Sequence, residues 1–126
     1  MKIKRINCLK IVELTNKLKN KIFNVETQYK LLLINKQCKQ EEEIYNEQLS
    51  LIIEKHAERD AKGSYIYNDQ GAIKIKTEYK NDCLNLTNQL EMVEVTMPDI
   101  YFTIDELESL ELSLLELEIL EPFIKI

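Results

Sequence analysis

The chain has 126 residues, of which 44% are hydrophobic and 31% charged, and its net charge is −5. This length fits one domain over residues 1–126, and two Gly with two Pro are too few for a loop-rich fold. The sequence has no apolar stretch of about 18 residues, and polar residues interrupt the run after the basic N-terminus, so we expect neither a membrane span nor a signal peptide.

Charge is distributed unevenly along the chain. Residues 1–40 hold ten basic and two acidic residues, a net charge of +8, and the remainder holds seven basic and twenty acidic residues, a net charge of −13. Lysine-rich helices can follow nucleic-acid phosphates. However, this segment has one Arg and few aromatic residues, which argues against base-specific recognition. We expect the chain's own acidic part to neutralise the basic part, without direct nucleic-acid binding.

Two helices are predicted in the first half. Residues 7–23 place apolar side chains at helical spacing with lysines between them. From residue 25 to about residue 61 no Gly or Pro interrupts a run of good helix formers, which predicts one long helix. The apolar positions of that helix are Leu31, Ile34, Cys38, Tyr45, Leu49, Ile52 and His56. We expect the long helix to pair with another helix, either within the chain or in a homodimer.

The apolar seam of the long helix is interrupted at residues 39–43, where the side chains are charged or amides. Three interpretations stay open for this stretch: the helix bends there, it is solvated there, or it presents the polar side chains to a partner.

Short elements are predicted in the second half. Gly63 suits the end of the long helix, and residues 64–67 and 72–76 flank a turn-forming tetrad, which indicates a β-hairpin. Thr77 is expected to cap a helix that reaches about Leu90. Residues 92–97 and 100–104 alternate like short strands, with a break at Pro98.

Two capping boxes occur near the end of the sequence. Thr103 with Glu106, and Ser113 with Glu116, each combine a cap hydroxyl with a Glu three residues later. They predict helices at about 104–111 and 114–121, the second stopped by Pro122. All elements together predict an α+β fold: a mainly helical single domain with one long helix, a small β-hairpin and short C-terminal helices.

Catalytic and metal-binding patterns are missing from the sequence. His56 is the single histidine, and a zinc site needs more His or Cys ligands at suitable spacing. Cys8, Cys38 and Cys83 are far apart and form no CxxC pair, which predicts reduced thiols in a cytosolic protein. The glycine-rich phosphate-binding motifs are absent as well. We therefore expect a protein that is not an enzyme and holds no cofactor or metal.

Acidic side chains are the candidate protein-binding residues. They lie on the long helix around residues 39–47 and on the terminal helices, where they alternate with leucines. One interpretation is an acidic surface that occupies a basic groove on another protein. The other is a pair of helices docked on the core with solvated carboxylates. The candidates are Glu41, Glu42, Glu43, Glu47, Asp105, Glu106, Glu108, Glu111, Glu116 and Glu118.

Four segments within residues 40–126 follow one another in a recognisable order, namely 54–60 (EKHAERD), 67–71 (YNDQG), 102–108 (FTIDELE) and 120–124 (LEPFI). In this order they resemble a group of small uncharacterised proteins of tailed phages and prophages of Gram-positive bacteria. The basic first helix departs from that group. The resemblance implies a viral source and expression in the host cytoplasm, and it carries over no catalytic or ligand residue.

From these observations we expect a phage-encoded, non-enzymatic accessory protein that binds a protein of the bacterial host. An inhibitor of a host antiviral defence system, comparable to an anti-CRISPR protein, is the leading hypothesis. The alternative is a structural or assembly accessory protein of the phage virion. A nucleic-acid-binding module is a third, weaker hypothesis.

Overall fold

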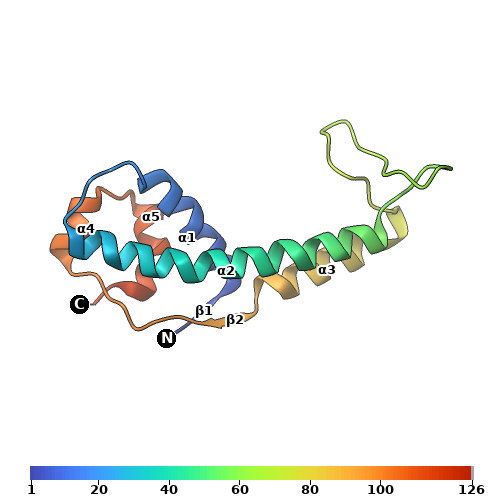
Figure 1. Cartoon of the computed structure of the whole chain (residues 1–126). Coiled ribbons are helices and arrows are strands. Elements are labelled where there is room, and N and C mark those ends of the chain that lie inside the picture. Colours follow the sequence, from blue (N-terminus) through green and yellow to red (C-terminus); the bar gives the residue numbers. More distant parts are fainter. Residues whose placement is uncertain (126) are drawn as a thin grey trace. The chain divides into compact units, whose positions relative to one another are not determined.

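A computed structural model describes residues 1–125 of the chain. Its helices and strands (Figure 1), in chain order, are β1 (Lys2–Lys4), α1 (Arg5–Leu18), α2 (Val25–His56), α3 (Lys80–Glu91), β2 (Glu94–Thr96), α4 (Ile104–Leu110) and α5 (Leu114–Ile119). The predicted fold class, α+β and mainly helical with one long helix, is confirmed. Within the described residues no helix is both long enough and apolar enough to cross a lipid bilayer.

The chain divides into two compact units. Unit 1 combines Met1–Glu43 with residues 93–125, and unit 2 is Ile44–Met92. The first part of α2 therefore belongs to unit 1 and its last part to unit 2. The expectation of a single domain over the whole chain stays a prediction.

Unit 1 holds the hydrophobic core of the described chain. Strands β1 and β2 pair antiparallel with Ile3 opposite Val95, and both side chains are buried. The most deeply buried aromatic side chains are Phe102 and Phe123, whose backbones are joined because Phe102 N donates to Phe123 O at 2.7 Å. The other buried core residues are Cys8, Ile11, Val12, Leu14, Leu18, Leu31, Ile34, Cys38, Met97, Leu107, Leu110 and Leu120.

Both predicted capping boxes are present in unit 1. The Thr103 hydroxyl accepts a hydrogen bond from Glu106 N, and the Glu106 carboxylate accepts one from Thr103 N. Ser113 and Glu116 make the same pair of bonds at the start of α5. Each box satisfies amides that have no partner within the first turn of a helix.

The first two helices end earlier than the sequence predicts. Helix α1 stops at Leu18 instead of continuing to residue 23, and Ile22 is 91% exposed. Helix α2 then begins at Val25 because Asn24 Oδ1 accepts a hydrogen bond from Thr27 N at 2.8 Å, which is an N-cap. At its other end α2 stops at His56, five residues before the predicted limit.

The predicted seam of α2 is confirmed by burial. Leu31, Ile34 and Cys38 are buried in unit 1, and the later seam positions Tyr45, Leu49 and Ile52 are half-buried in unit 2. The helix is continuous through the polar stretch at residues 39–43.

The residues after α2 explain its early end. The two segments of the predicted hairpin, residues 65–67 and 73–75, do pair, through an isolated antiparallel bridge between Tyr67 and Ile73. A third segment, residues 57–59, joins them through bridges between Ala57 and Ile75 and between Arg59 and Tyr65. Glu58 N donates to Lys74 O, Lys74 N donates to Ile66 O, and Ile66 N donates to Glu58 O. These three residues are eight positions apart in the sequence, and their backbone hydrogen bonds form a closed ring that includes one residue of each segment. Ala57 to Arg59 therefore leave the helix to pair with the two later segments. We call residues 57–76 the three-segment loop; in Figure 1 it is the yellow-green loop that follows α2.

Two equivalent turns connect the segments of the three-segment loop. Asp60 Oδ1 accepts hydrogen bonds from Lys62 N and Ser64 N. Asn68 Oδ1 accepts bonds from the residues at the same offsets, Gln70 N and Ala72 N. Gly63 and Gly71 follow at positive φ, 81° and 80°, a conformation that costs glycine little.

Helix α3 starts later than the sequence predicts. Residues Thr77–Tyr79 form a 3-10 turn, and the N-cap position of α3 is Tyr79, which makes no side-chain capping bond. Thr77 is therefore not the cap. Of the two predicted strands that follow, the first is β2, whereas residues 100–104 contribute only the bridge between Phe102 and Ile124.

Candidate protein-binding surface

The most exposed leucines of unit 1 lie at the start of α5. Leu114 is 85% exposed and Leu115 is 70% exposed. Both follow the Ser113 cap directly and lie in the first turn of α5, which has six residues. The capping box therefore fixes a short helix whose first turn presents leucine to solvent.

Two hollows border α5. One is lined by α1 and the residues around the end of α5: Asn7, Lys10, Glu13, Leu115, Glu118, Ile119, Glu121 and Pro122. The other is lined by Leu114, Leu117, Glu118, Glu121 and Ile124. Glu118 and Glu121 belong to both hollows. We call Leu114, Leu115, Glu118 and Glu121 the terminal surface.

The terminal surface combines apolar and acidic side chains. Its two exposed leucines provide area that gains free energy when it is removed from water. Its two exposed carboxylates carry negative charge, and Glu13 of α1 adds another beside them. One exposed cation, Lys10, lines the same hollow, so the acidic side chains are in excess there. Such an arrangement fits a surface that presents apolar groups together with Lys or Arg.

Three of the predicted binding carboxylates are engaged inside the chain. Glu41 Oε1 lies 3.3 Å from an Arg5 guanidinium nitrogen, and both side chains are largely shielded from solvent. Glu116 Oε2 lies 3.0 Å from Lys17 Nζ. Glu106 is buried and lies 2.8 Å from Lys30 Nζ. The expectation that all ten candidates form exposed acidic surfaces is corrected for these three.

These ion pairs also agree with the predicted neutralisation along the chain. Each of them joins a basic residue of the first 40 to an acidic residue from the later part. Hydrogen bonds from Ser113 and Lys17 lower the pKa of Glu116, so this carboxyl is ionised at neutral pH.

The other seven predicted carboxylates keep contact with solvent. Glu118 lies in the terminal surface, whereas Asp105, Glu108 and Glu111 are exposed on α4 and its C-terminal cap. On α2, Glu42 is half-buried, and Glu43 and Glu47 are exposed one helical turn apart.

The sequence pattern does not single out Leu114 and Leu115, because further leucines alternate with acidic residues along the same segment. The useful signal was present: two adjacent leucines directly after a cap, in a helix that a proline ends within eight residues.

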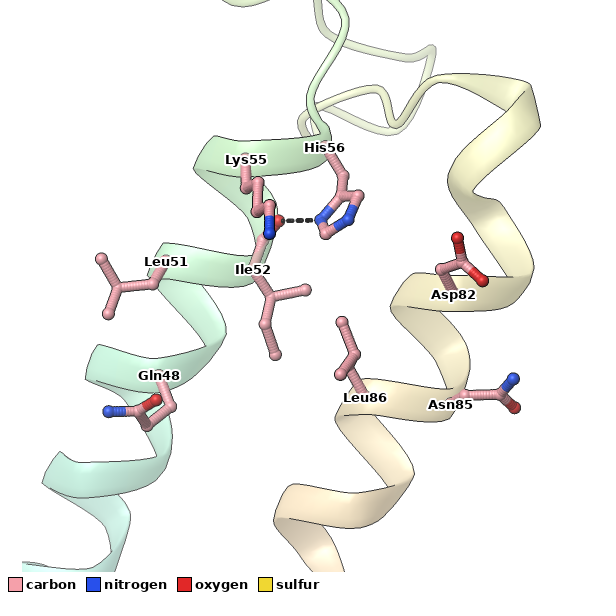
Figure 2. Close-up of a pocket in the computed structure, with 8 residues that line it drawn as sticks. All are labelled: Gln48, Leu51, Ile52, Lys55, His56, Asp82, Asn85 and Leu86. Atoms are coloured by element: carbon pink, nitrogen blue, oxygen red, sulfur yellow. Dashed lines mark hydrogen bonds between the residues drawn. The ribbon is translucent and has the colours of Figure 1, made fainter.

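A second concave site lies within unit 2, between α2 and α3 (Figure 2). We call it the helix-pair groove. In Figure 2, Ile52 of α2 and Leu86 of α3 point into the space between the two helices, whereas the Leu51 side chain lies on the flank of α2 away from α3. All three residues line the groove. The polar residues that line it are Gln48, Lys55, His56, Asp82 and Asn85.

His56 has a structural role at one end of the groove. Its Nδ1 lies 2.7 Å from the Ile52 carbonyl oxygen, which can only accept, so Nδ1 carries the proton and donates. The Tyr79 ring packs against the imidazole in a T-shaped arrangement, with 5.2 Å between the ring centroids. The ring is buried, and within residues 1–125 no group of three or more His, Cys, Asp or Glu is placed to hold a metal ion.

Comparison with known proteins adds no relative. No protein-family model, curated protein or solved structure matches the chain.

Proposed function

We propose that this chain is a non-enzymatic protein that works by binding another protein through the terminal surface. The observation that carries the proposal is the exposure of Leu114 and Leu115 beside Glu118 and Glu121. Clustered exposed apolar side chains with a polar rim are typical of interaction sites on soluble proteins.

The chemistry of the terminal surface limits the partner. Burying one of these leucines would contribute roughly 1.5–3 kcal/mol to binding. The carboxylates would repel an acidic partner and would speed association with a basic one. The partner we propose is a protein surface that is basic and partly apolar.

The resemblance of residues 40–126 to phage proteins supports a biological setting for this binding. In that setting the chain is a phage-encoded accessory protein in the host cytoplasm, and its partner is a host protein, such as a component of an antiviral defence system. Many such components bind nucleic acid and therefore carry a basic groove, which an acidic surface complements.

The test compares three forms of the tagged chain in host lysate and in cells. The wild type is expected to retain a defence component and to reduce phage restriction. The double variant Leu114→Asp with Leu115→Asp is expected to lose both properties, because two charges replace the apolar contact. Ile22→Asp is the matched control, because Ile22 is equally exposed in unit 1 and lies outside the terminal surface. The proposal fails if the double variant behaves as the wild type does.

The second candidate function is a structural or assembly accessory of the virion, which the same resemblance supports. Mass spectrometry of purified phage particles separates the two functions. A virion component stays with the particles at constant stoichiometry, whereas an inhibitor of a host protein does not.

A further inference from the structure

Unit 2 buries little of its own apolar surface. Across Ile44–Met92, all of which the structure describes, only His56 and Ala57 are buried. The large apolar side chains that remain exposed there are Ile44, Leu51, Tyr67, Tyr79, Leu84, Leu86 and Met92. Two antiparallel helices bury only the stripe at which they touch, and small units of this kind gain stability when more helices cover them.

The helix-pair groove is the concave part of that apolar surface. Ile52 and Leu86 form its apolar floor between the two helices, as Figure 2 shows, and Leu51 lines it from the flank of α2. The remaining lining side chains are polar. Leu51 is 58% exposed although it is flanked by the half-buried Ile52. An apolar floor with a polar border has the composition of an interface core and rim.

The charged residues of the groove are complementary to each other. The cation, Lys55, belongs to α2 and the anion, Asp82, belongs to α3. Because His56 packs on Tyr79, the end of α2 lies beside the start of α3, and Lys55 and Asp82 are found at the same end of the groove.

This distribution satisfies the condition for an isologous contact, in which the same surface binds itself. A twofold axis parallel to the helices places α2 of one copy opposite α3 of the other at the same level. Lys55 of each copy then faces Asp82 of the other copy, which makes two such contacts. Leu51 of each copy likewise faces Leu86 of the other copy. A twofold axis across the helices would instead place α2 opposite α2 and would leave these charges without opposite partners.

We propose that a second copy of this chain covers the helix-pair groove and that the two α2–α3 pairs form a four-helix bundle. In this bundle each helix has antiparallel neighbours, as is usual in such bundles. The proposal goes beyond binding through the terminal surface, because it uses different residues in a different unit. Variants of one surface therefore leave the other intact.

The first test is the oligomeric state of the full chain, measured by analytical ultracentrifugation up to about 100 µM, where weak dimers with micromolar dissociation constants are populated. The wild type is expected to sediment as two chains. Leu51→Asp is expected to raise the dissociation constant more than about tenfold, since a buried leucine is worth more than 1.4 kcal/mol. Leu84→Asp is the matched control: Leu84 is 59% exposed but does not line the groove, so this variant stays dimeric.

The second test uses charge exchange between copies. Lys55→Glu alone and Asp82→Lys alone each place like charges across the interface, and each weakens self-association. Mixing the two variants restores opposite charges at both contacts, so heterodimers form in excess of either homodimer in native mass spectrometry. Charge pairing within one chain cannot produce that excess, because both variants keep like charges across their own groove.

Three results overturn the proposal. These are a wild type that stays monomeric at about 100 µM, equal effects of Leu51→Asp and Leu84→Asp, and a mixture that forms no excess of heterodimer. The charge variants alter exposed side chains, so the second test stands even if Leu51→Asp lowers the helix content seen by circular dichroism.

Discussion

Lys30 Nζ lies 2.8 Å from Glu106 Oε1, and this ion pair joins α2 to α4 inside unit 1. The hydroxyl of Thr27 donates to the other oxygen of the same carboxylate at 3.1 Å, and Thr103 N donates to Oε1 at 3.0 Å. One buried carboxylate thus completes the capping box of α4 and holds two residues of α2.

Replacing Glu106 by Gln keeps the shape of the side chain and its ability to cap α4, but removes its charge. Lys30 then loses its buried partner, and we expect the free energy of unfolding to fall by about 2 kcal/mol. Urea denaturation at pH 7 measures the change. Glu108→Gln on the exposed face of α4 is the control, with an expected change below about 0.5 kcal/mol. Equal losses in the two variants would contradict the role assigned to the ion pair.

The same carboxyl predicts a dependence of stability on pH. Burial alone would raise the pKa of Glu106, but hydrogen bonds from Lys30, Thr103 and Thr27 outweigh it and lower the pKa. Because the folded pKa lies below the unfolded value of about 4.3, the contribution is complete above that value and is lost as pH falls through the folded pKa. The difference in stability between the wild type and Glu106→Gln should therefore shrink from pH 6 to pH 3. A constant difference over this range would show that Glu106 is not responsible.

Thiol labelling should separate the three free cysteines. Cys8 and Cys38 are fully buried in the core of unit 1, whereas Cys83 is partly exposed in unit 2. Burial and then Asp82 raise the pKa of Cys83, so we expect one slow modification by iodoacetamide at pH 8 and three in denaturant. Cys83→Ser should leave the native chain unlabelled. Rapid labelling of Cys8 or Cys38 would show that unit 1 opens readily.

The turn at Asn68 should control local order in the three-segment loop. Asn68→Ala removes the acceptor of two backbone amides, Gln70 N and Ala72 N, and should increase hydrogen exchange at Ile66 and Lys74. Asn68→Asp keeps the acceptor and is the control. Exchange in the core of unit 1 should not change in either variant, and a uniform increase over the whole chain would contradict the local effect.

Local signals in the sequence predicted the elements that depend on local chemistry. Thr103 and Ser113 identify the starts of α4 and α5, because a cap, its Glu partner and the helix lie within four residues. The long run without Gly or Pro identifies α2. By contrast, β1 has three residues and pairs with residues 90 to 94 positions away, which leaves no local pattern to recognise.

The candidate binding residues show the same contrast between what local sequence predicts and what long-range contacts decide. Glu106 and Glu116 occupy equivalent positions in two capping boxes, yet the first is buried and the second is not. Thr27 and Lys30, which are distant in sequence, contact the Glu106 carboxylate and cover it. Sequence reasoning therefore identified both residues but assigned Glu106 to a surface that it does not reach.

The hydrogen bonds among Glu58, Ile66 and Lys74 return to the residue at which they start. An open hairpin has two edges whose free amides and carbonyls can recruit a strand from another molecule. In the three-segment loop, the backbones of Glu58, Ile66 and Lys74 each donate one hydrogen bond and accept one within the loop. At these three residues the segments therefore have no free edge. The connection between α2 and α3 is therefore protected against edge-to-edge aggregation at this level by its own closure, without a proline.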